Sequence, residues 1–157
     1  MGYNAIPYDK RIKENIKNYT LSNLYDTETV KRYLQNLAEM LEINILLTDR
    51  HGEKEIVIGD SFLGFHPDVV NDPGRKIRVQ NRTVGHLYIK ELDEGRDKHL
   101  MNEMLDGTVA LLSKLGEEAY LHREGSIYLE ELEKQLEDRQ YKVIHNERED
   151  ILTGVFN

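Results

Sequence analysis

The feature that most constrains this chain is a segment near its carboxyl end that contains little to interrupt a helix. From about Gly95 to Glu149 the residues are mainly charged or aliphatic, and no proline occurs after Pro73. At ~1.5 Å per residue, a helix of about fifty residues spans roughly 75 Å, which exceeds the diameter of a domain of this size. The sequence therefore predicts one long helix that projects from its domain.

Apolar residues recur along this helix with two kinds of spacing. We expect a face that is buried against the domain or a partner helix, made of Leu100, Met104, Leu105, Val109, Leu112, Leu115 and Ala119. Steps of three and four are typical of a coiled coil, and they predict a homodimer interface made of Leu112, Leu115, Ala119, Leu129, Leu132, Leu136 and Val143. The chain is thus expected to pair with a second copy through its carboxyl-terminal helices.

The coiled-coil pattern changes frame near Leu129. The heptads upstream and downstream of this residue differ by three positions, an offset that overwinds a coiled coil locally. Gly125 lies beside the junction, and a glycine inside a helix costs ~1 kcal/mol relative to alanine. We interpret residues 122–129 as a hinge. The alternative is a chain break between two separate helices.

The preceding part of the chain predicts an α+β domain with a small antiparallel sheet of four or more strands flanked by helices. A short helix is expected over 9–18, a loop through 20–26, and a helix over 28–42 that Asp26 or Thr27 can cap. Alternating aliphatic residues then predict two hairpins, with strands at 43–49, 54–60, 75–80 and 83–91 and a tight turn at Asn81-Arg82. One face of the sheet is predicted to be apolar and to include Ile43, Ile45, Leu47, Ile77, Val79, Leu87 and Ile89.

The segment between the hairpins, residues 61–74, is expected to be a long loop or to contain a short helix. Long connections in compact domains are often functional. The loop and the more polar face of the sheet together predict a small-molecule site made of Phe62, Phe65, His66, Arg78, His86 and Tyr88. The alternative is that the two phenylalanines cap the core and Arg78 is solvated.

Composition excludes several classes of function. The net charge of −8 argues against sequence-independent binding of nucleic acid, which needs clustered Lys and Arg. The absence of Cys excludes disulfides, thiol catalysis and Cys-ligated metals, and no two of the six His are spaced as a zinc pair on a helix. No apolar run is long enough to cross a bilayer. We expect a cytoplasmic protein without a metal or cofactor.

The last eight residues, Asp150-Ile151-Leu152-Thr153-Gly154-Val155-Phe156-Asn157, resemble the opening motif of the GGDEF family of diguanylate cyclase domains. That motif reads Asp-x-Leu-Thr-Gly-Leu-x-Asn-Arg and follows a helical linker from an upstream sensor. Asp150, Leu152, Thr153, Gly154 and Asn157 match it, and Val155 replaces the usual Leu. The match covers eight residues, and its position after a charged, coiled-coil-like helix strengthens it.

The resemblance implies a division of the chain into four parts. These are an N-terminal helical segment (1–27), a sensor domain similar in outline to GAF-like or PAS-like domains (28–120), a coiled-coil linker helix (121–149) and the start of a GGDEF domain (150–157). It implies a sensory and dimerisation input module for a diguanylate cyclase in cyclic di-GMP signalling, with the catalytic residues lying outside this chain, which itself is not expected to be an enzyme. The alternative is a constitutive dimerisation scaffold that binds no ligand.

Overall fold

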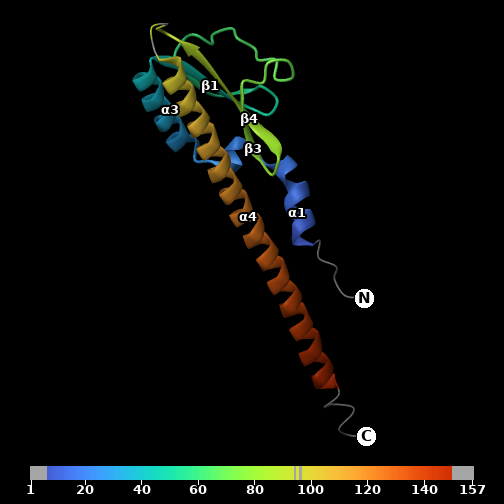
Figure 1. Ribbon diagram of the computed structural model, residues 1–157. Helices are drawn as coiled ribbons and strands as arrows, with labels where there is room; N and C mark the ends of the chain where they lie inside the picture. Colours follow the sequence, from blue (N-terminus) through green and yellow to red (C-terminus); the bar gives the residue numbers. More distant parts are fainter. Residues whose placement is uncertain (1–6, 94, 96, 150–157) are drawn as a thin grey trace.

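The protein has an α+β fold in which a four-stranded antiparallel sheet is followed by one long helix (Figure 1). A computed structural model describes residues 7–93, 95 and 97–149, with side chains in the last helix described as far as Gln140. In chain order the elements are α1 (Tyr8–Asn15), η1 (Ile16–Asn18), α2 (Leu21–Leu24), α3 (Thr27–Leu41), β1 (Ile43–Asp49), β2 (Lys54–Ile58), β3 (Arg75–Val79), β4 (Arg82–Glu91) and α4 (Lys98–Glu149).

The helices before the sheet begin and end where local chemistry allows. The predicted helix over 28–42 is confirmed as α3, which follows Asp26 and ends at Leu41, directly before Glu42, a capping residue with a left-handed backbone at φ 53°. The loop predicted over 20–26 is wrong, because it contains α2. The backbone N–H of Thr20 donates to Oδ1 of Asn23 at 3.0 Å, and this capping interaction stabilises the single turn of α2.

The sheet consists of two hairpins whose strands are arranged in the order β2-β1-β4-β3. β1 and β4 form the centre, and Leu46 of β1 lies opposite Tyr88 of β4. The β3–β4 turn lies at Gln80 and Asn81, with φ values of 53° and 61°, one residue earlier than predicted. Two successive left-handed residues match the twist of the flanking strands. Residues 61–74 contain no strand or helix, so the loop alternative is confirmed and no additional strand lies there.

The two faces of the sheet pack against different parts of the chain. The predicted apolar face is confirmed, and it forms the main core together with buried residues of α3 and α4 such as Leu34 and Leu105. α4 lies along β3, where the backbone N–H of Arg78 donates to Oγ of Ser113 at 3.2 Å. Leu46, Phe62 and Tyr88 form a second, smaller cluster on the other face.

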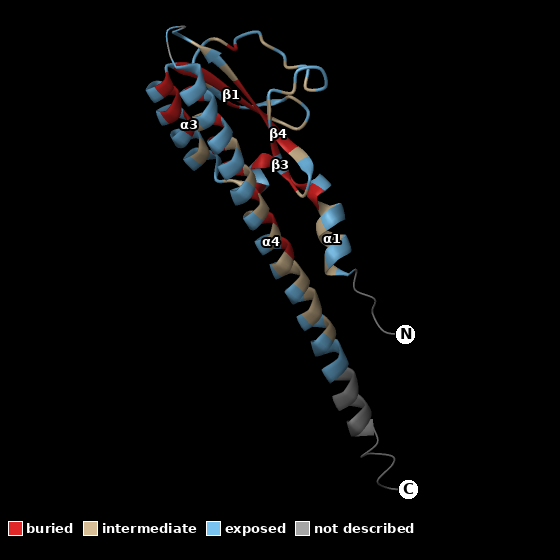
Figure 2. Cartoon of the chain, in the orientation of Figure 1, coloured by how far each residue is buried: buried red, intermediate tan, exposed pale blue. Residues whose placement is uncertain are grey.

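α4 is continuous through Gly125 and extends past the sheet, so the alternative of two separate helices is excluded (Figure 1). Its first part is buried against the sheet, at Met101, Leu105 and Leu112 among others. Its next part is buried against α1, and exposed residues predominate from there to Gln140 (Figure 2). The helix thus leaves the domain at the place where α1 packs against it.

Candidate functional site

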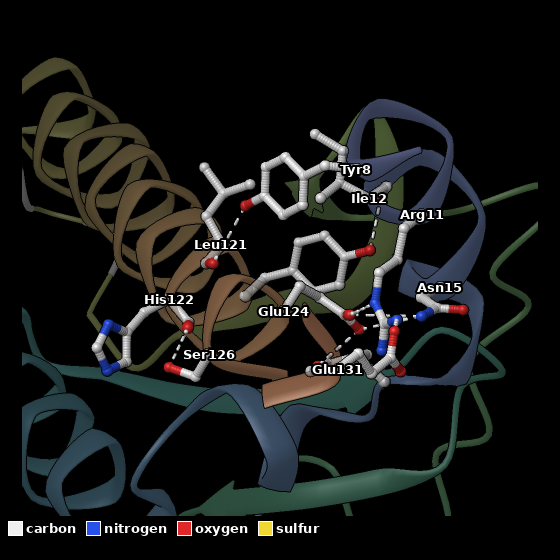
Figure 3. A network of polar contacts seen from close by, with 11 residues as sticks. Tyr8, Arg11, Ile12, Asn15, Leu121, His122, Glu124, Ser126 and Glu131 are labelled. Carbon is white, nitrogen blue, oxygen red and sulfur yellow. Dashed lines mark hydrogen bonds and ion pairs between the residues drawn. The ribbon is translucent and has the colours of Figure 1, made fainter. Parts of the chain in front are cut away.

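The most elaborate polar site in the described structure is a contact between α1 and α4, at the point where α4 leaves the sheet. Its centre is Glu124, whose side chain is only 2% exposed. The Glu124 carboxylate accepts hydrogen bonds from Arg11 Nε at 2.8 Å and from Asn15 Nδ2 at 3.3 Å (Figure 3). It also accepts one from the Tyr19 hydroxyl at 2.9 Å. We call these four residues the α1–α4 clasp.

Further contacts extend the clasp along both helices. A second N–H of Arg11 donates to Glu131 at 2.9 Å, nearly two turns further along α4 (Figure 3). The Tyr120 hydroxyl donates to the backbone carbonyl of Ile12 at 2.6 Å. The rings of Tyr19 and Tyr120 meet edge to face, with centroids 4.8 Å apart. All these contacts join residues more than a hundred positions apart in the chain, and they fasten the N-terminal segment to the long helix.

The electrostatics of the clasp favour a charged Glu124. Burial alone would raise the pKa of Glu124, but the hydrogen bonds from Arg11, Tyr19 and Asn15 together outweigh burial, so this pKa lies below its ordinary value. The hydrogen bond to Glu124 is the main reason that the pKa of Arg11 is raised. Burial, followed by the hydrogen bond to Glu124, raises the pKa of Tyr19 to about 12. At neutral pH the clasp is therefore an ion pair with a neutral tyrosine as an additional donor.

This arrangement predicts that part of the protein's free energy of unfolding is lost at acidic pH. Because the pKa of Glu124 is lower in the folded chain than in the unfolded chain, its contribution is fully present above the ordinary Glu pKa of about 4.3 and is lost as pH falls through the lowered value. Replacing Glu124→Gln removes the charge, and we expect it to cost about 2 kcal/mol at pH 7 and much less at pH 3. Urea unfolding at the two pH values measures both differences.

Glu133→Gln is the matched control for this prediction. Glu133 is an exposed carboxylate on the same helix, outside the clasp. We expect Glu133→Gln to change the unfolding free energy by less than about 0.5 kcal/mol at either pH. If Glu124→Gln lowered the free energy of unfolding equally at pH 7 and pH 3, the assigned role of the Glu124 charge would be contradicted.

The predicted small-molecule site is only partly brought together. Three of the predicted rings pack against one another. The centroids of Phe62 and Phe65 are 5.6 Å apart, and those of Phe65 and Tyr88 are 5.7 Å apart. His86 stacks on Tyr88 with centroids 6.4 Å apart. Phe62 is 1% exposed, so a ligand at this place would require the rings to separate. The other two predicted residues, His66 and Arg78, are exposed.

The loop that carries these rings is fastened to the sheet by several polar contacts. Lys54 and Lys90 donate to the backbone carbonyls of Phe62 and Ser61 at 3.0 Å and 2.8 Å. The Tyr88 hydroxyl donates to the carbonyl of Asp72 at 2.7 Å. The Lys90 ammonium also lies 5.2 Å from the centroid of the Phe62 ring, within cation–π range. In this conformation the loop covers the second face of the sheet.

The predicted dimer-interface residues divide into three groups. Leu112 is buried inside the chain's own core, so it does not belong to the surface that a partner would meet. Ala119 and Leu132 are half-buried, and Leu115, Leu129 and Leu136 are exposed. The side chain of Val143 lies outside the described residues. Leu100, which was expected on the buried face, is exposed as well.

Five leucines of α4 remain between 47% and 60% exposed, and we call them the leucine stripe: Leu100, Leu111, Leu115, Leu129 and Leu136. At about 100° per residue, all five fall within a sector of about 60° around the helix. Glu124 precedes Leu129 by five residues, which places the two about 140° apart around the helix. The leucine stripe and the α1–α4 clasp therefore lie on different sides of α4.

Sequence reasoning missed the clasp. It expected a short helix over 9–18 and a solvated charge pattern on the long helix, and nothing in the spacing distinguishes Glu124 from exposed neighbours such as Glu118. Four Tyr side chains and one Arg within the N-terminal segment were the available signal, because these types form hydrogen bonds when they are buried. Their partner on α4 could not be identified from sequence.

Other features bear on function only indirectly. Within the described residues, no three His, Asp or Glu side chains are grouped so that they could hold a metal ion. Likewise, none of the described helices is long and apolar enough to cross a membrane. The motif at Asp150, Leu152, Thr153, Gly154 and Asn157 lies outside the described residues. Comparison of the chain with protein-family models, with curated proteins and with solved structures finds no match.

Proposed function

We propose that this chain is a homodimeric input module that regulates a diguanylate cyclase domain following Asn157. The observation that carries this proposal is the leucine stripe on a helix of 52 residues, most of which runs beyond the sheet. Large apolar side chains gathered on one side of an exposed helix are typical of a surface that pairs with another protein. The resemblance of residues 150–157 to the start of a GGDEF domain supplies the proposed output.

In the proposed dimer, two copies of α4 pair along the leucine stripe and form a coiled coil. Leu129 and Leu136 are seven residues apart, one heptad, and therefore occupy equivalent positions of such a coil. Because the clasp lies on another side of α4, pairing leaves α1 in place. In this proposal residues 28–120 form a GAF-like or PAS-like sensor domain that receives the signal in the cytoplasm.

Regulation requires two states that a signal can distinguish. GGDEF diguanylate cyclases join two GTP molecules that are held by two catalytic domains. The geometry of the paired helices would therefore control cyclase activity, because it sets how the two domains face each other. We propose that residues 122–129, with Gly125, form the segment that changes register. A signal shifts the equilibrium only if it binds one register more tightly than the other.

We expect the chain to sediment as a dimer and the double substitution Leu129→Glu/Leu136→Glu to weaken dimerisation by more than about 100-fold. Burial of each leucine contributes ~1.5–3 kcal/mol, and both chains lose two of them. Analytical ultracentrifugation over a range of concentrations measures the effect. Lys134→Glu is the matched control, because it is exposed on the same helix and introduces the same change in charge as the two leucine substitutions. A wild-type chain that stays monomeric at the highest concentration tested would overturn the proposal.

A second candidate is a constitutive dimerisation scaffold that binds no ligand. The closed packing of Phe62, Phe65 and Tyr88 over the second face of the sheet favours it. The two candidates differ in a ligand screen by thermal shift, since a ligand that binds only the folded chain raises its melting temperature. A ligand that raises the melting temperature of the wild-type chain but not that of Tyr88→Ala supports a sensor that binds its ligand at the second face of the sheet.

A further inference from the structure

A polar pocket of about 240 Å³ lies beside the α1–α4 clasp, where four elements converge. Asn15 of α1, Asn18 of η1, Asn23 of α2 and Arg123 of α4 contribute to its lining. This volume lies somewhat below the range of roughly 300–1,000 Å³ that is common for drug-sized ligands, so it suits a small molecule. The pocket is separate from the sheet face on which the sequence predicts a ligand.

The floor and the rim of the pocket differ in burial. We call the buried lining residues, Tyr19 and Glu124, the floor of the pocket, and the exposed ones, Asn18, Asn23 and Arg123, its rim. The Glu124 carboxylate already accepts hydrogen bonds from the other three members of the clasp. Its acceptor capacity is thus used within the protein, and a cation entering the pocket would find no free carboxylate in the floor.

The rim, in contrast, presents donors. The Arg123 guanidinium lies over the Tyr19 ring, 5.5 Å from its centroid, which holds it at the edge of the pocket. Among the described residues, no carboxylate forms an ion pair with Arg123. Oδ1 of Asn23 accepts from both the backbone N–H and the hydroxyl of Thr20, at 3.0 Å each, and this fixes the amide while its NH2 group remains able to donate.

We propose that this pocket binds a small oxyanion, a carboxylate or a phosphate, through the Arg123 guanidinium and the amide groups of Asn18 and Asn23. Arg11 also lines the pocket, but its charge is matched by Glu124 and Glu131, so Arg123 supplies the positive charge for the ligand. Planar guanidinium groups bind carboxylates and phosphates with paired hydrogen bonds, and neutral amides add further donors.

The position of the pocket gives binding a mechanical consequence. A ligand held between Arg123 of α4 and the two asparagines before α3 would connect the same segments as the clasp does, within the first turn of the proposed hinge. Binding would then strengthen the attachment of residues 8–24 to α4. The binding site stands independently, while its role as the input of a cyclase rests on the proposed function.

The test is a titration of the full chain, followed by ¹H–¹⁵N NMR, with succinate in one arm and inorganic phosphate in the other at constant ionic strength. We expect saturable shifts of the Arg123 Nε–H and the Asn23 side-chain amide in at least one arm, with a dissociation constant of about 1 mM or lower. Response to one probe alone identifies the ligand class as carboxylate or phosphate. The absence of a saturable shift with either probe up to about 20 mM would overturn the site.

Variants on one helix separate this site from general charge effects. Arg123→Gln should weaken binding at least tenfold, whereas Arg139→Gln, which removes an exposed Arg further along α4, should leave it unchanged. Unaltered resonances of core residues establish that Arg123→Gln is folded, and undiminished binding by this variant would refute the proposal. Sedimentation of the wild-type chain tests dimerisation without any anion, so failure of the site and failure of the proposed function are distinguishable.

Discussion

Replacing Arg11→Met should destabilise the protein by about 3 kcal/mol, because it leaves the Glu124 carboxylate buried without its positive partner. The Arg11 side chain is 13% exposed and that of Glu124 only 2%, so solvent cannot replace the lost guanidinium without opening the contact between α1 and α4. Methionine retains most of the aliphatic volume, which limits the loss of packing. Urea unfolding and hydrogen exchange of the α1 amides measure the effect on the whole fold and on the helix itself.

The double substitution Arg11→Met/Glu124→Met should recover about 2 kcal/mol relative to Arg11→Met alone. Removing both charges abolishes the cost of burying one unpaired carboxylate, and the remaining loss of about 1 kcal/mol comes from the Tyr19 hydroxyl, which loses its acceptor. Lys13→Met is the control for surface charge, since Lys13 is exposed on the same helix. If the double substitution cost as much as Arg11→Met and Glu124→Met cost in sum, Arg11 and Glu124 would not be coupled.

The second large effect is expected from Gly116→Ala, which should destabilise the protein by about 2 kcal/mol. A Cβ at this position would overlap the hydroxyl of Tyr25 and lie 2.9 Å from Cγ2 of Val79. The Tyr25 hydroxyl donates to the backbone carbonyl of Leu112, so its ring cannot move without losing that bond. Overpacking costs ~1–3 kcal/mol and the lost hydrogen bond costs ~1 kcal/mol, and together they outweigh the gain of ~1 kcal/mol in helix propensity.

Gly107→Ala is the matched control, because it makes the same change on the same helix. Nothing lies within 4 Å of a Cβ at Gly107, so we expect this substitution to stabilise the protein by up to about 1 kcal/mol. Both variants are compared with the wild type by urea unfolding at one protein concentration, which keeps any contribution from dimerisation constant. If Gly116→Ala were as stable as Gly107→Ala, the close approach of Tyr25 to α4 would be refuted.

Local pattern was sufficient for most of the secondary structure. The period of two in residues 43–49 and 83–91 identified the two central strands, because their alternate residues face the core and the other face of the sheet. The absence of proline after Pro73 identified the long helix. The misplaced elements were short. α2 depends on a capping interaction between Thr20 and Asn23. The β3–β4 turn depends on two successive residues with a left-handed backbone, and their side-chain types alone did not fix the position of the turn.

The candidate site was far less accessible to sequence reasoning. Phe62, Phe65, His86 and Tyr88 were correctly expected to lie near one another, because strand alternation and the adjacent loop bring them to one face. Whether they line a cavity or fill it depends on side-chain packing, which alternation does not encode. The clasp joins Arg11 to Glu124 across 113 positions, and a single helical pattern carries no information about which distant helix will cover it.

The sequence by itself determined that this chain has an antiparallel sheet with one apolar face and a projecting helix with leucines spaced for pairing, since periodicity and the distribution of proline and glycine are local properties. Only the tertiary structure decided which leucines the chain buries itself. Leu112 lies in the core while Leu115, three residues later, is exposed, although both fit the same heptad pattern. The reason is that the sheet covers one side of α4 and α1 covers another, so burial depends on the neighbouring elements and not on spacing along the helix.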